Sequence, residues 1–375
     1  MSRLPEIAPV IERLFVERGA KLTDVAILQP ADPFLDTAGE DLRRRIFLTE
    51  SETGEELCLR PEFTIPVCLD HIASKADTPR RYAYLGEVFR QHRDGEAEFF
   101  QAGMEDLGDL DAARADARSL ADAFALLGGT LPGAELSATL GDQAVFEAVL
   151  GALGLPRGWR MRLARAFGSR GLLDAALAVL ANQRHARAAA GPAALLVAGG
   201  DEAALVDHIA DGMAEAGLPQ NEGRTAQEIA RRLIEKAELS NVRLTPQAFE
   251  ALRNFLAIRA PLGEAADALS AFAAQAGLSL DEALAPFADR VAAIKQETIP
   301  LDAVSYDAAF GRPLDYYTGL VFEIGAAGLD RPLVGGGRYD RLLTLLGAKT
   351  AIPGVGFSVW LDRIEAVARP SGRQP

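Results

Sequence analysis

The chain has 375 residues, of which 53 are acidic and 39 basic, so its formal net charge is −14. A protein that grips a nucleic-acid backbone needs a cationic footprint, which this balance does not provide on average. The composition therefore argues against binding of nucleic acid, although a local basic patch can survive in an acidic chain. At about 100–200 residues per domain, the length predicts two or three domains with hydrophobic cores.

The two cysteines and four histidines are too few and too scattered for a disulfide framework or a zinc site. We expect Cys58 and Cys68 to be small core residues in a reducing compartment. Residues 1–15 mix charged and apolar side chains, which argues against a signal peptide. No apolar run reaches the about 18–20 residues that a membrane span needs. The sequence predicts a cytoplasmic protein with neither a metal nor a cofactor.

Helical and extended patterns alternate in the first 160 residues. Apolar residues at three- and four-residue spacing predict helices at 6–19, 65–75 and 109–127. Extended segments are predicted at 25–28, 45–49, 57–60, 83–90 and 98–105, with the second and third forming a hairpin. Residues 93–96 would be the loop between two antiparallel strands.

Residues 161–298 are rich in Ala, Leu, Arg and Glu, and glycines and prolines cut them into short segments, which predicts a separate helical domain. Extended patterns return at 304–309, 320–325 and 356–359, and helices are predicted at 338–346 and 361–368. The glycine triplet 335–337 lacks the Gly-Lys-Ser/Thr sequence of a P-loop, so it is interpreted as a tight turn before a helix.

Hairpins with short loops favour an antiparallel sheet over repeated βαβ units. We therefore predict an α+β fold in which helices flank an antiparallel sheet. The sheet domain is discontinuous and consists of residues 1–160 and 299–375. An all-α domain, residues 161–298, is inserted into it.

Three extended segments each place polar side chains beside a glycine on one face, because alternate residues of a strand point the same way. These residues are Gln101, Gly103 and Glu105; Gly86 and Arg90; and Asp315, Tyr317, Gly319 and Glu323. The simplest alternative is a sheet face in contact with water. The aromatic residues and glycines favour a binding surface, since a glycine lets another group approach closely.

Together with Glu62 and Arg312, this set complements a zwitterionic amino acid. Carboxylates can hold its ammonium group, and an arginine can bind its carboxylate through two hydrogen bonds. A carboxylate such as Glu105 beside the phenol of Tyr317 can hold both nitrogens of a polar ring. Glu62 alone would more often be a surface or capping residue.

Short strings then occur in the order found in the catalytic core of histidyl-tRNA synthetase, a class II aminoacyl-tRNA synthetase. They are Leu-Arg-Pro-Glu-Phe-Thr at 59–64, the pair 84–90 and 100–105, Arg-Pro-Leu-Asp-Tyr-Tyr at 312–317, Gly-Gly-Arg-Tyr-Asp at 336–340, and 354–363. The chain resembles this family across residues 59–363. The resemblance implies a class II synthetase-like sheet with a pocket for L-histidine.

The resemblance also assigns a part of the ligand to each matching residue. The α-amino group of histidine is expected to contact Glu62, Thr64 and Gln101. Its imidazole is expected to lie between Glu105 and Tyr317.

Four further residues complete the implied histidine pocket. Arg312 is expected to face the carboxylate of histidine, and Arg90 the place where an adenylate would form. Asp315 and Tyr316 would shape the pocket.

Of a nucleotide site, only Arg93 and Arg363 are expected to remain. The loop that begins at Arg93 is short and acidic where the synthetase clamps ATP phosphates with arginines, and nearby carboxylates repel a triphosphate. Gln91-His92 stands where the family usually has a glutamate, and Pro313 replaces a glycine. Only 12 residues follow Arg363, where the synthetase has an anticodon-binding domain.

A chain that keeps the amino-acid pocket but lacks the phosphate clamp and the anticodon-binding domain is similar to the regulatory subunit of ATP phosphoribosyltransferase. This resemblance implies a non-catalytic subunit that pairs with a short catalytic subunit in a hetero-octamer. It would be required for the activity of that subunit and for histidine feedback inhibition in the first step of L-histidine biosynthesis. It also implies a homodimer formed through the first helix.

Two alternatives stay open. The retained Arg312 and Arg363 allow a stand-alone histidine-activating (adenylating) synthetase paralogue. The other alternative is an interaction protein whose pocket is vestigial.

Overall fold

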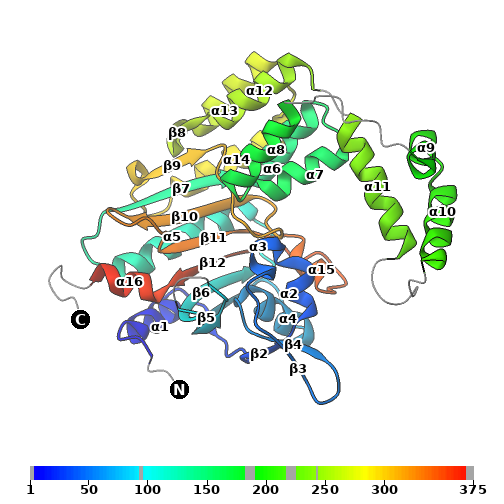
Figure 1. Ribbon diagram of the computed structural model, residues 1–375. Coiled ribbons are helices and arrows are strands. Elements are labelled where there is room, and N and C mark those ends of the chain that lie inside the picture. The colour runs from blue at the N-terminus through cyan, green and yellow to red at the C-terminus, as the bar shows by residue number, and fades with distance from the viewer. Residues whose placement is uncertain (1–3, 93–95, 182–190, 217–224, 242–243, 369–375) are drawn as a thin grey trace.

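A large sheet runs through the middle of the computed structural model, which describes residues 4–92, 96–181, 191–216, 225–241 and 244–368 (Figure 1). In order across this nine-stranded sheet, the described strands are β1 (Lys21–Leu22), β5 (Arg80–Phe89), β6 (Glu98–Leu107), β12 (Gly354–Trp360), β11 (Val334–Arg338), β10 (Leu320–Ala326), β7 (Leu136–Asp142), β9 (Val304–Asp307) and β8 (Arg259–Pro261). Neighbouring strands are antiparallel except in the pairs β1–β5 and β7–β9. The prediction of a large, mainly antiparallel sheet is confirmed.

The strands predicted at 83–90 and 98–105 are the inner parts of β5 and β6. They pair antiparallel, and the register sets Gly86 opposite Gln101 and Tyr84 opposite Gly103. On the other side of β6, β12 sets Trp360 opposite Gln101. Because β6 is paired on both sides, the direction of each side chain that it carries is fixed by the sheet.

A small three-stranded sheet precedes β5 and consists of β2 (Leu28–Pro30), β4 (Glu56–Leu59) and β3 (Leu48–Glu50). The antiparallel pairing of β3 with β4 confirms the predicted hairpin. The strand predicted at 25–28 is wrong, because β2 begins only at Leu28. Two short helices that the pattern did not predict follow it, α2 (Asp32–Thr37) and α3 (Gly39–Arg43). The proline in the first turn of α2 was a usable helix-start signal.

Helices cover both faces of the large sheet. The predicted helices 6–19, 65–75 and 109–127 are confirmed as α1 (Ala8–Glu17), α4 (Thr64–Ser74) and α5 (Ala112–Thr130), and 361–368 as α16 (Leu361–Ala368). The Asp111 side chain caps α5 by accepting a hydrogen bond from the Arg114 amide at 3.1 Å. α5 packs on β6, β10, β11 and β12, while α4 and the small sheet border the opposite face. No described helix is long and apolar enough to cross a bilayer.

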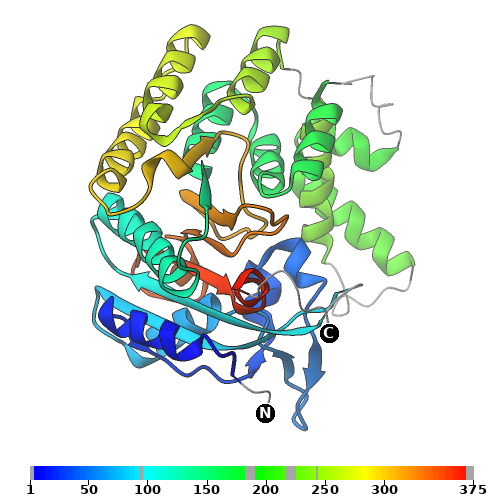
Figure 2. The same cartoon turned by 90° about the vertical axis from the view of Figure 1, so that its left-hand side faces the viewer.

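The middle of the chain is helical, as predicted, except for β8. After α6 (Gln143–Ala152), its described helices are α7 (Arg157–Ala166), α8 (Arg170–Ala181), α9 (Pro192–Gly199), α10 (Glu202–Glu215), α11 (Ala226–Asn241), α12 (Pro246–Leu256), α13 (Leu262–Ala276) and α14 (Asp281–Ile294). Both views place α12 and α13 near the β8 end of the sheet (Figures 1 and 2). α14 packs along α5, and Phe146, Phe167 and Phe255 form a stack in a shared core. The division at 160/161 and 298/299 stays a prediction.

The glycine triplet lies inside β11, so its prediction as a turn is wrong. A Cβ on Gly336 would lie 2.5 Å from the carbonyl oxygen of Gly356, and one on Gly337 would lie 2.5 Å from that of Leu320. The neighbouring strands therefore use the space that the missing side chains leave. The helix predicted at 338–346 is shorter in the structure, where α15 spans Leu342–Leu345. The 3₁₀ turn Leu301–Ala303 and β9 begin the C-terminal part of the sheet.

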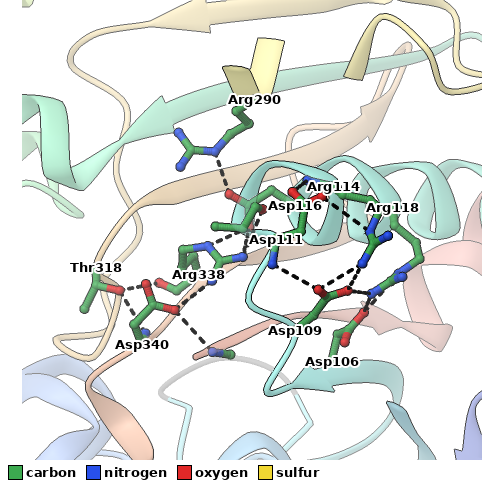
Figure 3. A network of polar contacts seen from close by, with 12 residues as sticks. Asp106, Asp109, Asp111, Arg114, Asp116, Arg118, Arg290, Thr318, Arg338 and Asp340 are labelled. Carbon is green, nitrogen blue, oxygen red and sulfur yellow. Dashed lines mark hydrogen bonds and ion pairs between the residues drawn. The ribbon is translucent and has the colours of Figure 1, made fainter. Parts of the chain in front are cut away.

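A buried polar network ties α14 to α5 and to the end of β11 (Figure 3). Arg290 of α14 donates to both Asp116 of α5 and Asp142 at the end of β7. Arg338 of β11 donates from Nε to Asp116 at 2.8 Å and from Nη1 to Asp340 at 2.7 Å. Each guanidinium has carboxylate partners, as buried charges require.

Candidate functional site

A cavity of 990 Å³, here called the main cavity, lies on the sheet face opposite α5. The β6 residues on this face are the odd-numbered ones, as strand parity predicts. Seven of the nine residues predicted to bind histidine line the main cavity: Glu62, Thr64, Arg90, Gln101, Arg312, Tyr316 and Tyr317. The structure thus brings together residues from positions 62 to 317 of the chain.

Glu62 holds the start of α4 at the edge of the main cavity. Its carboxylate accepts hydrogen bonds from the amides of Thr64 at 2.7 Å and Ile65 at 2.9 Å. The alternative that Glu62 is a capping residue is therefore correct, and it is compatible with ligand contact because each carboxylate oxygen has a second lone pair. Burial raises the pKa of Glu62 above its ordinary value, while these amides and Arg90 act in the opposite direction.

Glu105 lies immediately behind the main cavity and is only 1% exposed. Its carboxylate accepts hydrogen bonds from Thr64 Oγ1 at 2.7 Å, from Tyr84 Oη at 3.3 Å and from Tyr339 Oη. Tyr84 is held in turn by Ser358 Oγ at 2.7 Å. Three hydroxyls therefore fix the orientation of this carboxylate.

Burial raises the pKa of Glu105 to about 8, against the hydrogen bonds from its hydroxyl partners. The nearby negative charge of Glu62 acts in the same direction as burial. At neutral pH the folded chain therefore holds a proton at Glu105. A basic ring that approaches this carboxyl group can receive that proton or displace it.

The raised pKa predicts how stability depends on pH. Between the ordinary value of 4.5 and about 8, the folded chain binds a proton at Glu105 that the unfolded chain has released, so stability falls as pH rises through this window. One such group contributes a slope of up to about 1.4 kcal/mol per pH unit. Glu105→Gln removes this proton, so urea unfolding at about pH 5.5 and 7.5 should show a shallower decrease than the parent chain. Equal slopes for the two proteins would rule out the raised pKa.

Two buried polar atoms of residues that line the main cavity have no hydrogen-bond partner among the described residues. They are the side-chain oxygen of Gln101, a residue 1% exposed, and Nε of Arg312. One is an acceptor and the other a donor, and both residues line the same cavity. Buried polar groups in native proteins nearly always have hydrogen-bond partners. One acceptor and one donor without partners therefore mark a place for a ligand or ordered water.

Arg312 is held in place by the sheet around it. Its Nη1 donates to the carboxylate of Glu323, and its guanidinium lies 5.9 Å from the ring centre of Trp360. A Cβ on Gly335 would lie 2.0 Å from Nη1 of Arg312, so the first glycine of the triplet makes room for this guanidinium. The sequence pattern had no means of pairing Gly335 with a residue 23 positions earlier.

The remaining predicted histidine-binding residues take different places. Tyr316 and Tyr317 are buried, with ring centres 5.0 Å apart, in the segment before β10, which begins only at Leu320. The predicted strand face 315–323 is therefore wrong for its first half. Asp315 is exposed and lines a second cavity instead of the main one. Arg90 donates from Nε to the carbonyl oxygen of Pro61 at 2.7 Å.

The predicted nucleotide residues are only partly described. Arg363 stacks over Trp360 at 4.1 Å in the main cavity, and burial lowers its pKa to about 10. Arg93 lies outside the described residues. The main cavity is nevertheless basic, because its described lining includes three arginines that were not predicted, Arg44, Arg45 and Arg331.

Tyr339 is a further cavity residue that the sequence did not predict as part of the site. It is 1% exposed, lines the main cavity and donates to Glu105. It lies between Arg338 and Asp340, which bond away from the cavity into the network of Figure 3. The resemblance covered residues 336–340, and the alternation within that string was the signal that could have identified this tyrosine.

Comparisons with known proteins find relatives over nearly the full length of the chain. A sequence model of the family described as histidyl-tRNA synthetase matches residues 2–237 and 203–364. Three curated relatives are each named ATP phosphoribosyltransferase regulatory subunit. That of Mesorhizobium japonicum is 69% identical over 366 residues, and that of Chelativorans sp. 64% over 366 residues, each covering 98% of both chains. That of Agrobacterium fabrum is 58% identical over 364 residues and covers 97% of both.

Solved structures share the fold. One described as an ATP phosphoribosyltransferase regulatory subunit/histidyl-tRNA synthetase, from Bacillus halodurans, has a TM-score of 0.68 at 20% identity, over 99% of this chain and 82% of that one. A histidyl-tRNA synthetase from Nostoc sp. has a TM-score of 0.62 at 16% identity, over 96% of this chain and 70% of that one. At these identities, the match shows that this chain has the histidyl-tRNA synthetase fold.

Proposed function

The chain belongs to the family of ATP phosphoribosyltransferase regulatory subunits, and on this premise we propose that it binds L-histidine in the main cavity and transmits feedback to a short catalytic subunit. As a member of this family it is a non-catalytic subunit of an enzyme of histidine biosynthesis. The finer parts of the proposal concern the ligand, its binding residues and the assembly.

The single observation that carries the histidine proposal is the pair of unpartnered atoms in the main cavity. The Gln101 oxygen can accept from an ammonium group, and Arg312 Nε can donate to a carboxylate. These are the two charged ends of an α-amino acid. A ligand that makes both contacts removes two unsatisfied buried groups at once, which favours it over apolar occupants of similar size.

The side chain of the ligand would then point toward Glu105. Glu62 and Thr64 are proposed to contact the ammonium group, since both line the main cavity and the Glu62 carboxylate can accept from a cation. Glu105 and Tyr317 are proposed to take the two imidazole nitrogens. Tyr316 closes the wall beside Tyr317, and we propose that Asp315 and Arg90 act on the pocket from its surroundings.

Regulation requires that histidine bind two states of the assembly with different affinity, typically by about 1–3 kcal/mol of coupling free energy. We propose that this chain is needed for the activity of the short catalytic subunit and for its inhibition by histidine. The proposed assembly is a hetero-octamer built on a homodimer of this chain through α1. Val16 of α1 is 71% exposed, which leaves an apolar side chain available for such a contact. Two buried free thiols suit a cytoplasmic location.

Calorimetry with L-histidine on the purified chain, followed by inhibition of a mixture with a short catalytic subunit, tests the proposal. The parent chain should bind histidine and confer histidine inhibition. Gln101→Leu should weaken both by about tenfold or more, since it removes an acceptor for a charged donor. Gln29→Leu is the matched control, because Gln29 is a buried glutamine outside the main cavity that bonds to its own loop. Absence of histidine binding to the parent chain would refute the proposed ligand.

The second candidate is a histidine-activating paralogue, favoured by Arg363 over Trp360 and by the arginines in the main cavity. Histidine-dependent exchange of pyrophosphate into ATP by the isolated chain separates the two. Exchange would support the second candidate, and histidine binding without exchange supports the first.

A further inference from the structure

A second cavity, of 550 Å³, lies between helix α7 and the sheet domain. Helices α2, α6 and α15 supply the other walls, together with residues 312–317. Its volume falls in the range of about 300–1,000 Å³ that small-molecule sites occupy. The 312–317 segment separates it from the main cavity, since Arg312, Tyr316 and Tyr317 line both.

Helix α7 is the most basic element of this acidic chain. Its sequence, Arg-Gly-Trp-Arg-Met-Arg-Leu-Ala-Arg-Ala, holds four arginines and no acidic residue. Trp159 and Leu163 face the core, so the arginines occupy the remaining surface of the helix. Arg157, Arg160 and Arg165 line the second cavity.

These three guanidiniums have no ion-pair partner among the described residues. All three are exposed, and within the part of the chain that the structure describes no carboxylate lies within 4.0 Å of any of them, whereas Arg290 and Arg338 in the interior are paired. Arg341 also lines the cavity and makes one long contact of 3.9 Å with Glu147. Three arginines without an ion-pair partner among the described residues therefore line one cavity.

Carboxylates are present in the second cavity but do not balance this charge. Asp36, Glu147 and Asp315 line it, against Arg312 and the four arginines already named. Arg312 is engaged by Glu323, which does not line this cavity. The local balance is positive in a chain of net charge −14, so the second cavity, like the main one, favours anions that the chain as a whole repels.

The cavity also has an apolar wall. Met161 of α7, Leu314 and Leu345 line it beside the ring of Tyr316. Guanidinium groups suit phosphate oxygens, because they donate paired hydrogen bonds in one plane. An apolar wall beside them suits a ring attached to the phosphates.

We propose that the second cavity binds a ligand that carries two or more linked phosphates, and that Arg157, Arg160 and Arg165 are its phosphate-binding residues. The site is separate from the main cavity, and its occupation does not depend on the proposed function. A ligand in the second cavity lies against the 312–317 segment, which also borders the main cavity.

The test is calorimetry on the full chain with inorganic pyrophosphate and with ATP as probes. Arg157→Ala combined with Arg160→Ala should weaken binding of at least one probe by about tenfold or more, since each guanidinium supplies charge-assisted bonds. Arg162→Ala is the matched control, because Arg162 lies on the same helix but over Trp159 and not in the cavity. It should leave binding unchanged. Tighter binding of ATP than of pyrophosphate would identify the ligand as a nucleotide, and similar binding would identify the phosphates alone as the recognised group.

Three outcomes would overturn the proposal. The first is absence of binding of either probe. The second is an equal loss with Arg162→Ala, which would indicate a nonspecific effect of helix charge. The third is a loss with Arg363→Ala but not with the α7 variant, which would place the phosphates in the main cavity.

Discussion

Replacing Asp116 by alanine is expected to lower the free energy of unfolding by about 3–5 kcal/mol, the usual cost of breaking a buried ion pair from one side. Asp116 is fully buried and receives Nε of Arg290 at 2.5 Å and Nη2 of Arg338 at 2.7 Å. Its removal leaves two guanidiniums in the interior with one carboxylate partner fewer. Urea unfolding of the parent and variant chains measures the difference.

The matched control for this variant is Asp111→Ala on the same helix. Asp111 also accepts a hydrogen bond, but its side chain is 53% exposed, caps α5 and forms a 3.7 Å ion pair with Arg114 of the same helix. Its loss should cost about 1 kcal/mol. If the two variants were equally stable, the network of Figure 3 would not be what fastens α14 to the sheet.

Asp116→Ala should also disturb the main cavity, although Asp116 does not line it. Tyr339 lies between Arg338 and Asp340, both of which bond into the network, and it donates to Glu105. If Arg338 and Asp340 are held less firmly, the Tyr339–Glu105 contact between them and the cavity loosens too. Asp116→Ala is therefore expected to weaken histidine binding as well as stability. Asp111→Ala, which touches neither, should leave binding unchanged.

Local patterns predicted the elements whose partners lie close in the sequence. Helices α1, α4 and α5 follow their apolar spacing, and β5 and β6 pair across a short loop. The parity of β6 placed Gln101 and Glu105 on one face, where both are now found buried. These features depend on periodicity alone, which one sequence displays.

The periodicity of the sequence did not predict contacts between residues that lie far apart in the chain. The hydrogen bonds of Glu105 come from Thr64, Tyr84 and Tyr339, the last of them 234 residues away, and no local pattern predicts these partners. Gly335 was interpreted as part of a turn, since glycine has low strand propensity. Its place in β11 is explained by the guanidinium of Arg312, which fills the space that a side chain would need.

Arg312→Lys is expected to weaken histidine binding by about 2–5 kcal/mol, which is roughly 30- to 5,000-fold in affinity, if the proposed function holds. A lysine keeps the charge but lacks the planar pair of donors that binds a carboxylate through two hydrogen bonds. It also lacks the Nε of Arg312, which has no hydrogen-bond partner among the described residues. Calorimetry with L-histidine measures the loss.

Two comparisons separate this reading from a simple loss of charge or packing. Arg45→Lys changes an arginine that lines the same cavity but is 40% exposed and pairs with Asp41, so its effect should be small. Glu323→Gln releases Arg312 from its carboxylate, which leaves the guanidinium freer to bind that of the ligand and should not weaken binding as Arg312→Lys does. Unchanged affinity for Arg312→Lys would remove Arg312 from the carboxylate end of the ligand. The unpartnered Gln101 oxygen would then be the remaining polar anchor in the main cavity, and the ligand would need only an ammonium group.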